Sequence, residues 1–123
     1  MLVVEDDEMV ADVVRISLAL EGYEVTHVTN ADAALAMIEQ TPPDLILLDI
    51  MLPEIDGWEV LKQVRSHPDA GDIPIIVLTA RSAPTDQDRG LSLGASAYVT
   101  KPFAPDELVA TVREVLQNAA QAD

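Results

Sequence analysis

Five polar side chains stand at the C-terminal ends of four short apolar runs. The apolar runs are Leu2–Val4, Leu45–Leu48, Ile75–Leu78 and Ala97–Thr100. Glu5 and Asp6 follow the first run, Asp49 follows the second, Thr79 the third and Lys101 the fourth. If the runs are neighbouring parallel strands, these side chains meet in the crevice outside the carboxyl ends of the sheet, where open α/β proteins bind ligands. Three carboxylates, a hydroxyl and an ammonium suit a divalent cation and a phosphoryl group.

Carboxylates at such close range need a positive partner. Two of them about 4 Å apart repel each other by roughly 4 kcal/mol at an effective dielectric constant near 20. The cluster persists if a cation neutralises it or if one carboxyl group takes up a proton. Mg²⁺ binds one or two carboxylates together with phosphate oxygens, so it fits Glu5, Asp6 and Asp49. Taken alone, each acid could equally be a solvated strand end or a helix cap.

Lys101 and Thr79 supply groups that recognise phosphoryl oxygens. A lysine ammonium acts as a point charge for phosphate, and a threonine hydroxyl donates a hydrogen bond. Taken alone, a lysine is most often a surface residue, and a threonine is an ordinary strand residue. The step from Lys101 to Pro102 is more informative, because X-Pro bonds are the main site of cis peptides. A cis bond there would point the ammonium back over the strand ends.

Length, composition and charge restrict the class of protein. The 123 residues fit one domain, and 49% hydrophobic residues is normal for a globular chain. The net charge of −15 argues against direct binding to nucleic acids or anionic membranes, which need a basic surface. The chain has no cysteine and therefore no disulfide framework. No apolar run approaches the roughly 18 residues of a membrane span, and no signal peptide opens the sequence, so we expect a cytoplasmic location by default.

Strand-like and helix-like patterns alternate five times, which predicts a parallel sheet with right-handed crossovers and helices on both faces. The expected strands are 2–4, 24–28, 45–48, 75–78 and 97–100. The expected helices are 7–21, 31 to the break at Pro42, 58–66, 85–93 and 105–116. The helix at 85–93 is the weakest, because Gly90 inside it costs about 1 kcal/mol relative to alanine. We predict a single three-layer α/β domain.

Apolar spacing predicts which side of the first and last helices packs against the sheet. In the helix at 7–21, which Gly22 ends, the residues expected to face inward are Val10, Val13, Val14 and Ser17. In the helix at 105–116 they are Leu108, Val109, Val112, Val115 and Leu116.

The strand ends and their neighbours form motifs that run through the whole chain in order. The motifs are Val3-Val4-Glu5-Asp6, Leu47-Leu48-Asp49 with Pro53 and Gly57, Leu78-Thr79-Ala80, and Tyr98-Val99-Thr100-Lys101-Pro102-Phe103. Together they resemble the receiver domain of two-component response regulators, at that family's spacings. The resemblance implies a flavodoxin-like (βα)₅ receiver fold with a five-stranded parallel sheet of order 2-1-3-4-5. It also implies a receiver domain at residues 1–118, followed by a frayed tail at 119–123.

The resemblance assigns a role to each residue of the strand-end cluster. It implies that Asp49 is the phosphoacceptor and that Asp6 is a direct ligand of Mg²⁺. Glu5 corresponds to the acid that reaches the metal mostly through water, and Met51 to the position whose backbone carbonyl binds the metal. Lys101 corresponds to the lysine that contacts the phosphoryl group.

Two further residues correspond to a conformational switch in the same family. Thr79 corresponds to the switch hydroxyl, and Tyr98 to an aromatic residue that turns inward when the threonine moves toward the phosphate. We expect the switch surface to be the face formed by the helix at 85–93, the strand at 97–100 and the helix at 105–116.

The implied reaction is a Mg²⁺-dependent transfer of a phosphoryl group to Asp49 from a phosphohistidine. The partner would be a histidine kinase or a histidine phosphotransfer protein. The chain would then be a signalling phosphoacceptor, and not an enzyme, that takes part in its own phosphorylation and autodephosphorylation. The resemblance also allows a phosphorylation-dependent homodimer or a contact with an output domain, and it implies no direct binding of this domain to nucleic acids or membranes.

The chain departs from family members that dimerise through the switch surface. Such members open the last strand with an acidic pair, where this chain has Ser96 and Ala97, and they often carry an arginine where this chain has Thr111. Their intermolecular salt bridges are therefore not expected here.

Three other interpretations use part of the same pattern. A haloacid-dehalogenase-type phosphatase needs a second aspartate two positions after the first, where this chain has Met51. A flavodoxin-like cofactor protein needs a glycine-rich or hydroxyl-rich phosphate loop after the first strand, where the acids lie instead. A phosphorylation-independent, receiver-like interaction module would normally lack Asp49, Asp6 or Lys101, all of which are present. This last alternative is the main rival.

Overall fold

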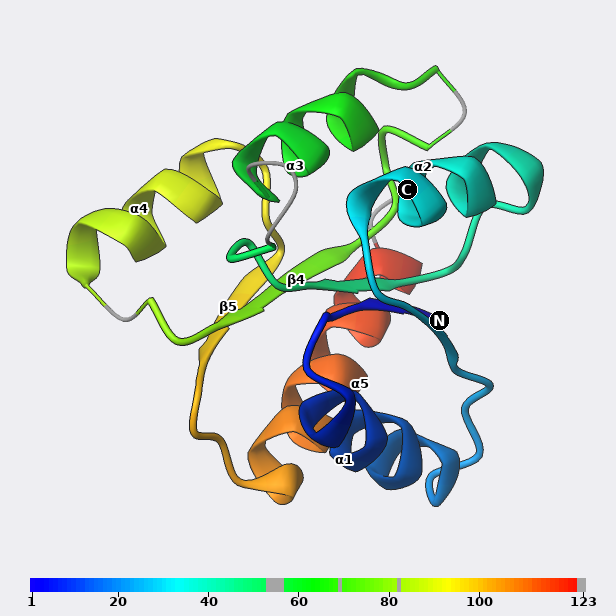
Figure 1. The fold of residues 1–123 in the computed structure, drawn as a ribbon, viewed down its shortest axis with the longest axis vertical. Coiled ribbons are helices and arrows are strands. Elements are labelled where there is room, and N and C mark those ends of the chain that lie inside the picture. The colour runs from blue at the N-terminus through cyan, green and yellow to red at the C-terminus, as the bar shows by residue number, and fades with distance from the viewer. Residues whose placement is uncertain (53–56, 69, 82, 122–123) are drawn as a thin grey trace.

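Five short strands alternate with five helices along the chain, in the predicted order (Figure 1). The elements are β1 (Leu2–Val4), α1 (Glu8–Ala19), β2 (Thr26–Val28), α2 (Ala31–Gln40), β3 (Ile46–Leu48), α3 (Gly57–Ser66), β4 (Ile75–Thr79), α4 (Pro84–Ser92), β5 (Ala97–Thr100) and α5 (Pro105–Gln121). The computed structural model describes residues 1–52, 57–68, 70–81 and 83–121. Pro53–Asp56 of one predicted motif, together with Ala122 and Asp123 of the predicted tail, lie outside the described residues.

The five strands form one parallel sheet in the order β2-β1-β3-β4-β5, which confirms the predicted topology. α2, α3 and α4 lie on one face of the sheet, and α1 and α5 lie on the other (Figure 1). In the register of the sheet, Val4 lies between Val28 and Leu48. The residues that follow β1 and β3 therefore leave the sheet side by side.

Successive residues of each strand point to opposite faces, which gives the domain two buried clusters. On the side of α2 and α3 the strands contribute Leu2, Val4, Ile46, Leu48, Ile75 and Val77. On the side of α1 and α5 they contribute Val3, Leu47, Ile76 and Leu78. Coverage on both faces explains why β3 and β4 are continuous apolar runs. β2 lies at the edge of the sheet, and its Thr26 is exposed.

The predicted inward face of α1 is wrong in part. The buried residues of α1 are Ala11, Val14 and Leu18, whereas Val13 is 44% exposed. Residues three, four and seven positions apart share one face of a helix, and α1 offers two such apolar stripes. The stripe built on a small alanine packs against the sheet. The other stripe remains on the surface and contains Met9, Val13, Ile16 and Leu20.

The helix boundaries follow local capping chemistry. The Asp7 carboxylate accepts a hydrogen bond from the Met9 amide at 3.0 Å and caps α1, and Asn30 caps α2 in the same way. Gly22 has a φ of +90° just after α1, as expected of a glycine that ends a helix. α5 continues to Gln121, beyond the predicted end at Leu116, so residues 119–121 of the predicted tail are helical.

Gly57 at the start of α3 packs directly on the segment that follows Asp49. A Cβ atom added at Gly57 would lie 2.2 Å from the Ile50 Cα atom, and the Gly57 amide donates a hydrogen bond to the Ile50 carbonyl at 3.2 Å. Because the obstacle is backbone, no side-chain movement can relieve the clash. α3 thereby limits where the residues next to Asp49 can lie.

Substitution of Gly57 should therefore be costly. We predict that Gly57→Ala lowers the free energy of unfolding by about 3 kcal/mol or more, at the upper end of the range for overpacked sites. Urea denaturation measures the change. Glu59→Ala, at an exposed position of the same helix, is the matched control and should change stability by less than about 0.5 kcal/mol. A Gly57→Ala protein as stable as the control would show that the two segments can separate without cost.

Candidate functional site

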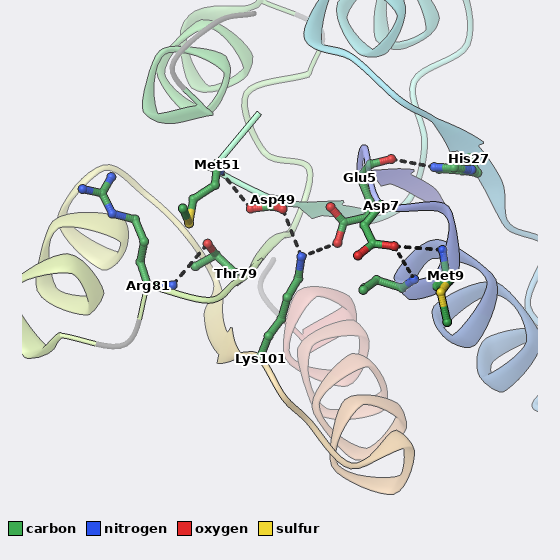
Figure 2. A network of polar contacts seen from close by, with 10 residues as sticks. Glu5, Asp7, Met9, His27, Asp49, Met51, Thr79, Arg81 and Lys101 are labelled. Atoms are coloured by element: carbon green, nitrogen blue, oxygen red, sulfur yellow. Dashed lines mark hydrogen bonds and ion pairs between the residues drawn. The ribbon is translucent and has the colours of Figure 1, made fainter. Parts of the chain in front are cut away.

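The ends of β1 and β3 and the segment after β5 bring three charged side chains together (Figure 2). Lys101 Nζ donates a hydrogen bond to Glu5 Oε1 and another to Asp49 Oδ2, the latter at 3.0 Å. Glu5 and Asp49 lie side by side because Val4 pairs with Leu48 in the sheet. The Lys101–Pro102 peptide bond is cis. The predicted convergence of these three side chains is therefore present in the structure.

Asp49 is buried, and both of its carboxylate oxygens accept hydrogen bonds. Oδ1 accepts from the Met51 amide at 2.8 Å, and Oδ2 accepts from Lys101. Burial acts to raise the pKa of Asp49, but the contacts with Glu5, the Met51 amide and Lys101 outweigh burial and hold the pKa below its usual value. Asp49 therefore remains a carboxylate at neutral pH.

Glu5 is even more deeply buried, at 1% exposure, and behaves differently. Burial, followed by its contact with the negatively charged Asp49, raises the pKa of Glu5 to about 7. Among the described residues, no donor reaches Glu5 Oε2. For Lys101, burial acts to lower the pKa, but the contacts with Glu5 and Asp49 outweigh it and raise the pKa above its usual value. One ammonium thus serves two carboxyl groups.

The acidic residues at these strand ends have the chemistry of a site for a hard dication. One carboxylate oxygen from each of Glu5, Asp6 and Asp49 can be chosen so that all three lie within 4.8 Å of one another. Glu5 and Asp49 are buried and Asp6 is exposed, so the cluster opens to solvent on one side. Oxygen ligands and the unpartnered Glu5 Oε2 atom fit Mg²⁺, which prefers oxygen and retains several waters.

Thr79 and Tyr98 meet at the main chain of Arg81. The Thr79 hydroxyl accepts a hydrogen bond from the Arg81 amide at 3.4 Å, and the Tyr98 hydroxyl donates to the Arg81 carbonyl at 2.7 Å. Thr79 itself is fully buried at the end of β4, on the Met51 side of Asp49 in Figure 2. The sequence predicted a role in the switch for both Thr79 and Tyr98. It did not indicate that both side chains would contact the main chain of the same residue, Arg81.

Two contacts of the site had no signal in the sequence. Met51 contributes its amide to Asp49, whereas the predicted role of its carbonyl in metal binding stays a prediction. His27 Nε2 lies 2.7 Å from the main-chain oxygen of Glu5. A histidine on an edge strand with alternating polarity resembles any half-exposed strand residue, so its contact depends on the register between β1 and β2, which only the structure shows.

Comparison with known proteins identifies the family. Residues 1–113 match the model of the response regulator receiver domain, so the chain belongs to this family. It is a receiver domain of a two-component response regulator. None of the helices in the described part of the chain is both long and apolar enough to cross a membrane.

Individual relatives agree with this assignment. The sensory transduction protein RegX3 of Mycobacterium bovis is 43% identical over 99% of this chain and 52% of its own length. The phosphate regulon transcriptional regulatory protein PhoB of Rhizobium meliloti is 41% identical over 95% of this chain and 52% of its own length. The chain therefore spans about half the length of these curated relatives. A CheY-like receiver domain structure from Methanospirillum hungatei superimposes with a TM-score of 0.91 at 31% identity, covering 99% of this chain and 96% of its own.

Loss of the Lys101 charge should leave two buried carboxyl groups without a cation. We predict that Lys101→Met, in the presence of a metal chelator, lowers the free energy of unfolding at pH 8 by about 3 kcal/mol, the usual cost of breaking a buried ion pair. The folded-state pKa of Glu5 is about 7, above the usual glutamate value of 4.5. The folded protein therefore takes up a proton as the pH falls from above 7 toward 4.5. Protonation removes the repulsion, and the deficit should narrow below pH 7.

Urea denaturation at pH 8 and pH 6 tests this prediction. Lys62→Met is the matched control, because Lys62 is an exposed lysine on α3, and it should change stability little at either pH. An equal deficit for Lys101→Met at both pH values would show that lost packing, and not lost charge, accounts for the effect.

Proposed function

We propose that Asp49 accepts a phosphoryl group from the phosphohistidine of a histidine kinase or histidine phosphotransfer protein, in a reaction that requires Mg²⁺. The observation that carries this proposal is the buried Asp49 carboxylate held beside Lys101 and Glu5 at the end of β3. An oxygen of Asp49 forms a bond to phosphorus as the bond from phosphorus to the imidazole nitrogen breaks. The product is an acyl phosphate on Asp49, and the released imidazole takes up a proton from solvent.

The residues of the site provide charge neutralisation and positioning, which are the main needs of a loose phosphoryl-transfer transition state. Asp49 is ionised and is therefore ready as a nucleophile, in line with its lowered pKa. Asp6 and Glu5 would hold Mg²⁺ together with Asp49, and the bound ion would supply positive charge for the phosphoryl oxygens. Lys101 Nζ, already 3.0 Å from Asp49, would contact the same oxygens.

The contacts of Arg81 support a switch in which Thr79 and Tyr98 change together. A Thr79 hydroxyl that turned to a phosphoryl oxygen would give up the Arg81 amide, and the Arg81 main chain also holds the Tyr98 hydroxyl. The Tyr98 ring packs over Gly90 of α4, where an added Cβ atom would lie 3.0 Å from the ring. Gly90 is the one buried residue of α4, all nine residues of which are described. Such a weakly packed helix is the kind of element that moves in a switch.

An apolar hollow beside the site supports a protein as the phosphodonor. The hollow has a volume of about 500 Å³ and lies between α1 and the segment after β5. It is lined by Met9, Val10, Val13, Ala80, Lys101, Pro102 and Phe103. Because Lys101 belongs both to the hollow and to the charged cluster, a donor helix resting in the hollow would bring its phosphorylated side chain close to Asp49. A histidine-containing protein with an apolar helix face would fit this surface.

Thr111 and Ser96 lie where dimerising family members carry charged residues, and both side chains make hydrogen bonds within the domain. The Thr111 hydroxyl donates to the Glu107 carbonyl of its own helix at 2.9 Å, and the Ser96 hydroxyl accepts from the Ile75 amide at 3.2 Å. Neither residue carries a charge, so a homodimer or output-domain contact through the α4–β5–α5 face would need contacts other than salt bridges at these two positions. The cytoplasmic location stays a prediction. A phosphorylation-independent interaction module is the alternative function.

Asp49→Asn is the first test of the proposed function. We predict that the wild-type protein gains one phosphoryl group when incubated with Mg²⁺ and a small acyl-phosphate donor, and that Asp49→Asn gains none, because a carboxamide is not a nucleophile for this reaction. Removal of Mg²⁺ with a chelator, or the substitution Asp6→Ala, should slow the wild-type reaction strongly. Intact-protein mass spectrometry measures the added group.

Two outcomes of that experiment would contradict the proposal. Stable phosphate on Asp49→Asn would place the acceptor elsewhere. No phosphate on the wild-type protein from the small donor, nor from any phosphorylated histidine protein, would favour the interaction module.

Met9→Glu tests whether the apolar hollow binds the donor protein. Met9 is 80% exposed, so the substitution should not disturb folding, but it puts a carboxylate at the edge of the hollow. We predict at least about tenfold slower transfer from a phosphohistidine protein and an unchanged rate from the small acyl phosphate, because burying an unpaired charge in an apolar contact is unfavourable. The measurement is the rate of phosphorylation with each donor.

Leu20→Glu is the matched control, since Leu20 is 81% exposed at the other end of α1 and does not line this hollow. Equal slowing by both substitutions would indicate a general charge effect on encounter with the donor. Slowing with the small donor as well would contradict a docking role for the hollow.

A further inference from the structure

His27 on the edge strand β2 holds a peptide group of the acidic cluster. Its Nε2 atom lies 2.7 Å from the main-chain oxygen of Glu5 (Figure 2). A carbonyl oxygen can only accept a hydrogen bond, so Nε2 must carry the proton and donate it. The oxygen belongs to the peptide that links Glu5 to Asp6. The His27 side chain on β2 therefore contacts the peptide group that links Glu5 and Asp6, two of the three clustered acids.

This contact determines more than the position of one oxygen. The Glu5 amide donates to the Val28 carbonyl at 3.1 Å, which holds the start of the residue in the sheet. The six atoms from the Glu5 Cα to the Asp6 Cα lie in one plane, because the peptide bond is planar. With the amide of Glu5 and its carbonyl both held by β2, the plane cannot rotate freely. Because the Asp6 Cα atom lies in this plane, its position is restricted as well.

Among the three clustered acids, Asp6 is the one whose position depends most on its backbone. Its side chain is exposed, unlike those of Glu5 and Asp49, so packing does not hold it. On its C-terminal side, Asp7 is fixed as the cap of α1, where its carboxylate accepts from the Met9 amide at 3.0 Å. On its N-terminal side, His27 holds the preceding peptide. The backbone of Asp6 is thus held from both directions, while its exposed carboxylate stays within the acidic cluster.

We propose that His27 is a positioning residue for metal binding, which acts through the Glu5–Asp6 peptide to preorganise the carboxylate of Asp6. The inference rests on the proposed function, because it assumes that the acidic cluster holds Mg²⁺. His27 does not touch the ion in this role. Groups behind metal ligands commonly raise affinity by holding the ligands in the binding geometry, and their loss costs about 10-fold to 100-fold in affinity.

The test compares Mg²⁺ binding by His27→Phe and His27→Gln. Phenylalanine keeps a planar ring and suits a strand, but it has no donor. Glutamine retains an N–H group that can donate to the same carbonyl. We expect calorimetric titration with Mg²⁺ alone to show about a tenfold larger dissociation constant for His27→Phe, and a value close to that of the wild type for His27→Gln. In phosphorylation assays, His27→Phe should need more Mg²⁺ for half-maximal rate but reach a similar rate at saturation.

Val28→Ala is the control for a merely structural effect. Val28 is the next residue of β2 and packs against the core, and its main-chain bond to Glu5 does not depend on its side chain. This substitution should lower stability without changing the affinity for Mg²⁺. Unchanged Mg²⁺ binding by folded His27→Phe would overturn the inference and leave the proposed function intact. No Mg²⁺ binding by the wild-type protein would overturn both.

A measurement on the unsubstituted protein covers the case in which His27→Phe does not fold. Nitrogen NMR of the imidazole should show a proton on Nε2, since that atom donates to the Glu5 carbonyl. A neutral ring with its proton on Nδ1 alone would rule out the donated bond and with it the inference. Folded His27→Gln that bound Mg²⁺ as weakly as His27→Phe would also contradict the inference, because glutamine keeps a donor for the Glu5 carbonyl.

Discussion

Two carboxyl groups are buried beside a single ammonium, and the rest of the site depends on how this imbalance of charge is resolved. The sheet imposes the arrangement, because pairing of Val4 with Leu48 sets Glu5 next to Asp49. Lys101 contacts both, yet the two respond in opposite directions: the pKa of Glu5 rises to about 7 while that of Asp49 falls. Asp49, the proposed nucleophile, therefore stays ionised, and Glu5 is the group whose ionisation the shared burial disfavours. A site of this kind gains stability from added positive charge, which is the property that metal-assisted phosphoryl transfer needs.

The convergence of the site could be predicted because it depends only on topology. Once Glu5, Asp49 and Lys101 are placed after strands of one parallel sheet, their meeting follows from the shared edge of that sheet. What could not be predicted depends on register and on competition between similar faces. His27 reaches Glu5 only because β2 pairs with β1 in one register. In the same way, α1 carries two apolar stripes of helical spacing. The stripe that contains Ala11 packs against the sheet, so Val13, on the other stripe, lies on the surface.

The two ends of the sheet differ in how firmly their loops are held. At the N-terminal end of β4, Arg65 donates to the Gly94 carbonyl with Nε at 2.9 Å and Nη2 at 2.7 Å, and to Gly71 and Ile73 with Nη1. One guanidinium thus joins α3 to the loops on both sides of the β4–α4 unit. Burial lowers the pKa of Arg65, but the group remains charged at any physiological pH, so these bonds persist. At the opposite end of the sheet, near Arg81, the contacts are two hydrogen bonds with uncharged hydroxyl groups and a longer ion pair, 3.8 Å from Arg81 Nε to Asp86 Oδ1.

This asymmetry bears on how a phosphoryl group at Asp49 could move α4. The C-terminal end of α4 leads into Gly94, whose carbonyl is bound twice by Arg65, whereas its N-terminal side follows the Arg81 segment, held by Thr79 and Tyr98. Between these ends the helix buries only Gly90 among its residues, all of which are described. Near its C-terminal end α4 is also tied to α3, because the Arg89 guanidinium lies 4.9 Å from the centre of the Trp58 ring. We therefore expect any movement of α4 to be larger at its N-terminal end, where the contacts are weaker. Loss of the 3.4 Å contact between the Thr79 hydroxyl and the Arg81 amide is a small change. In the proposed switch, a shift of α4 would turn that change into a larger displacement of the α4–β5–α5 surface.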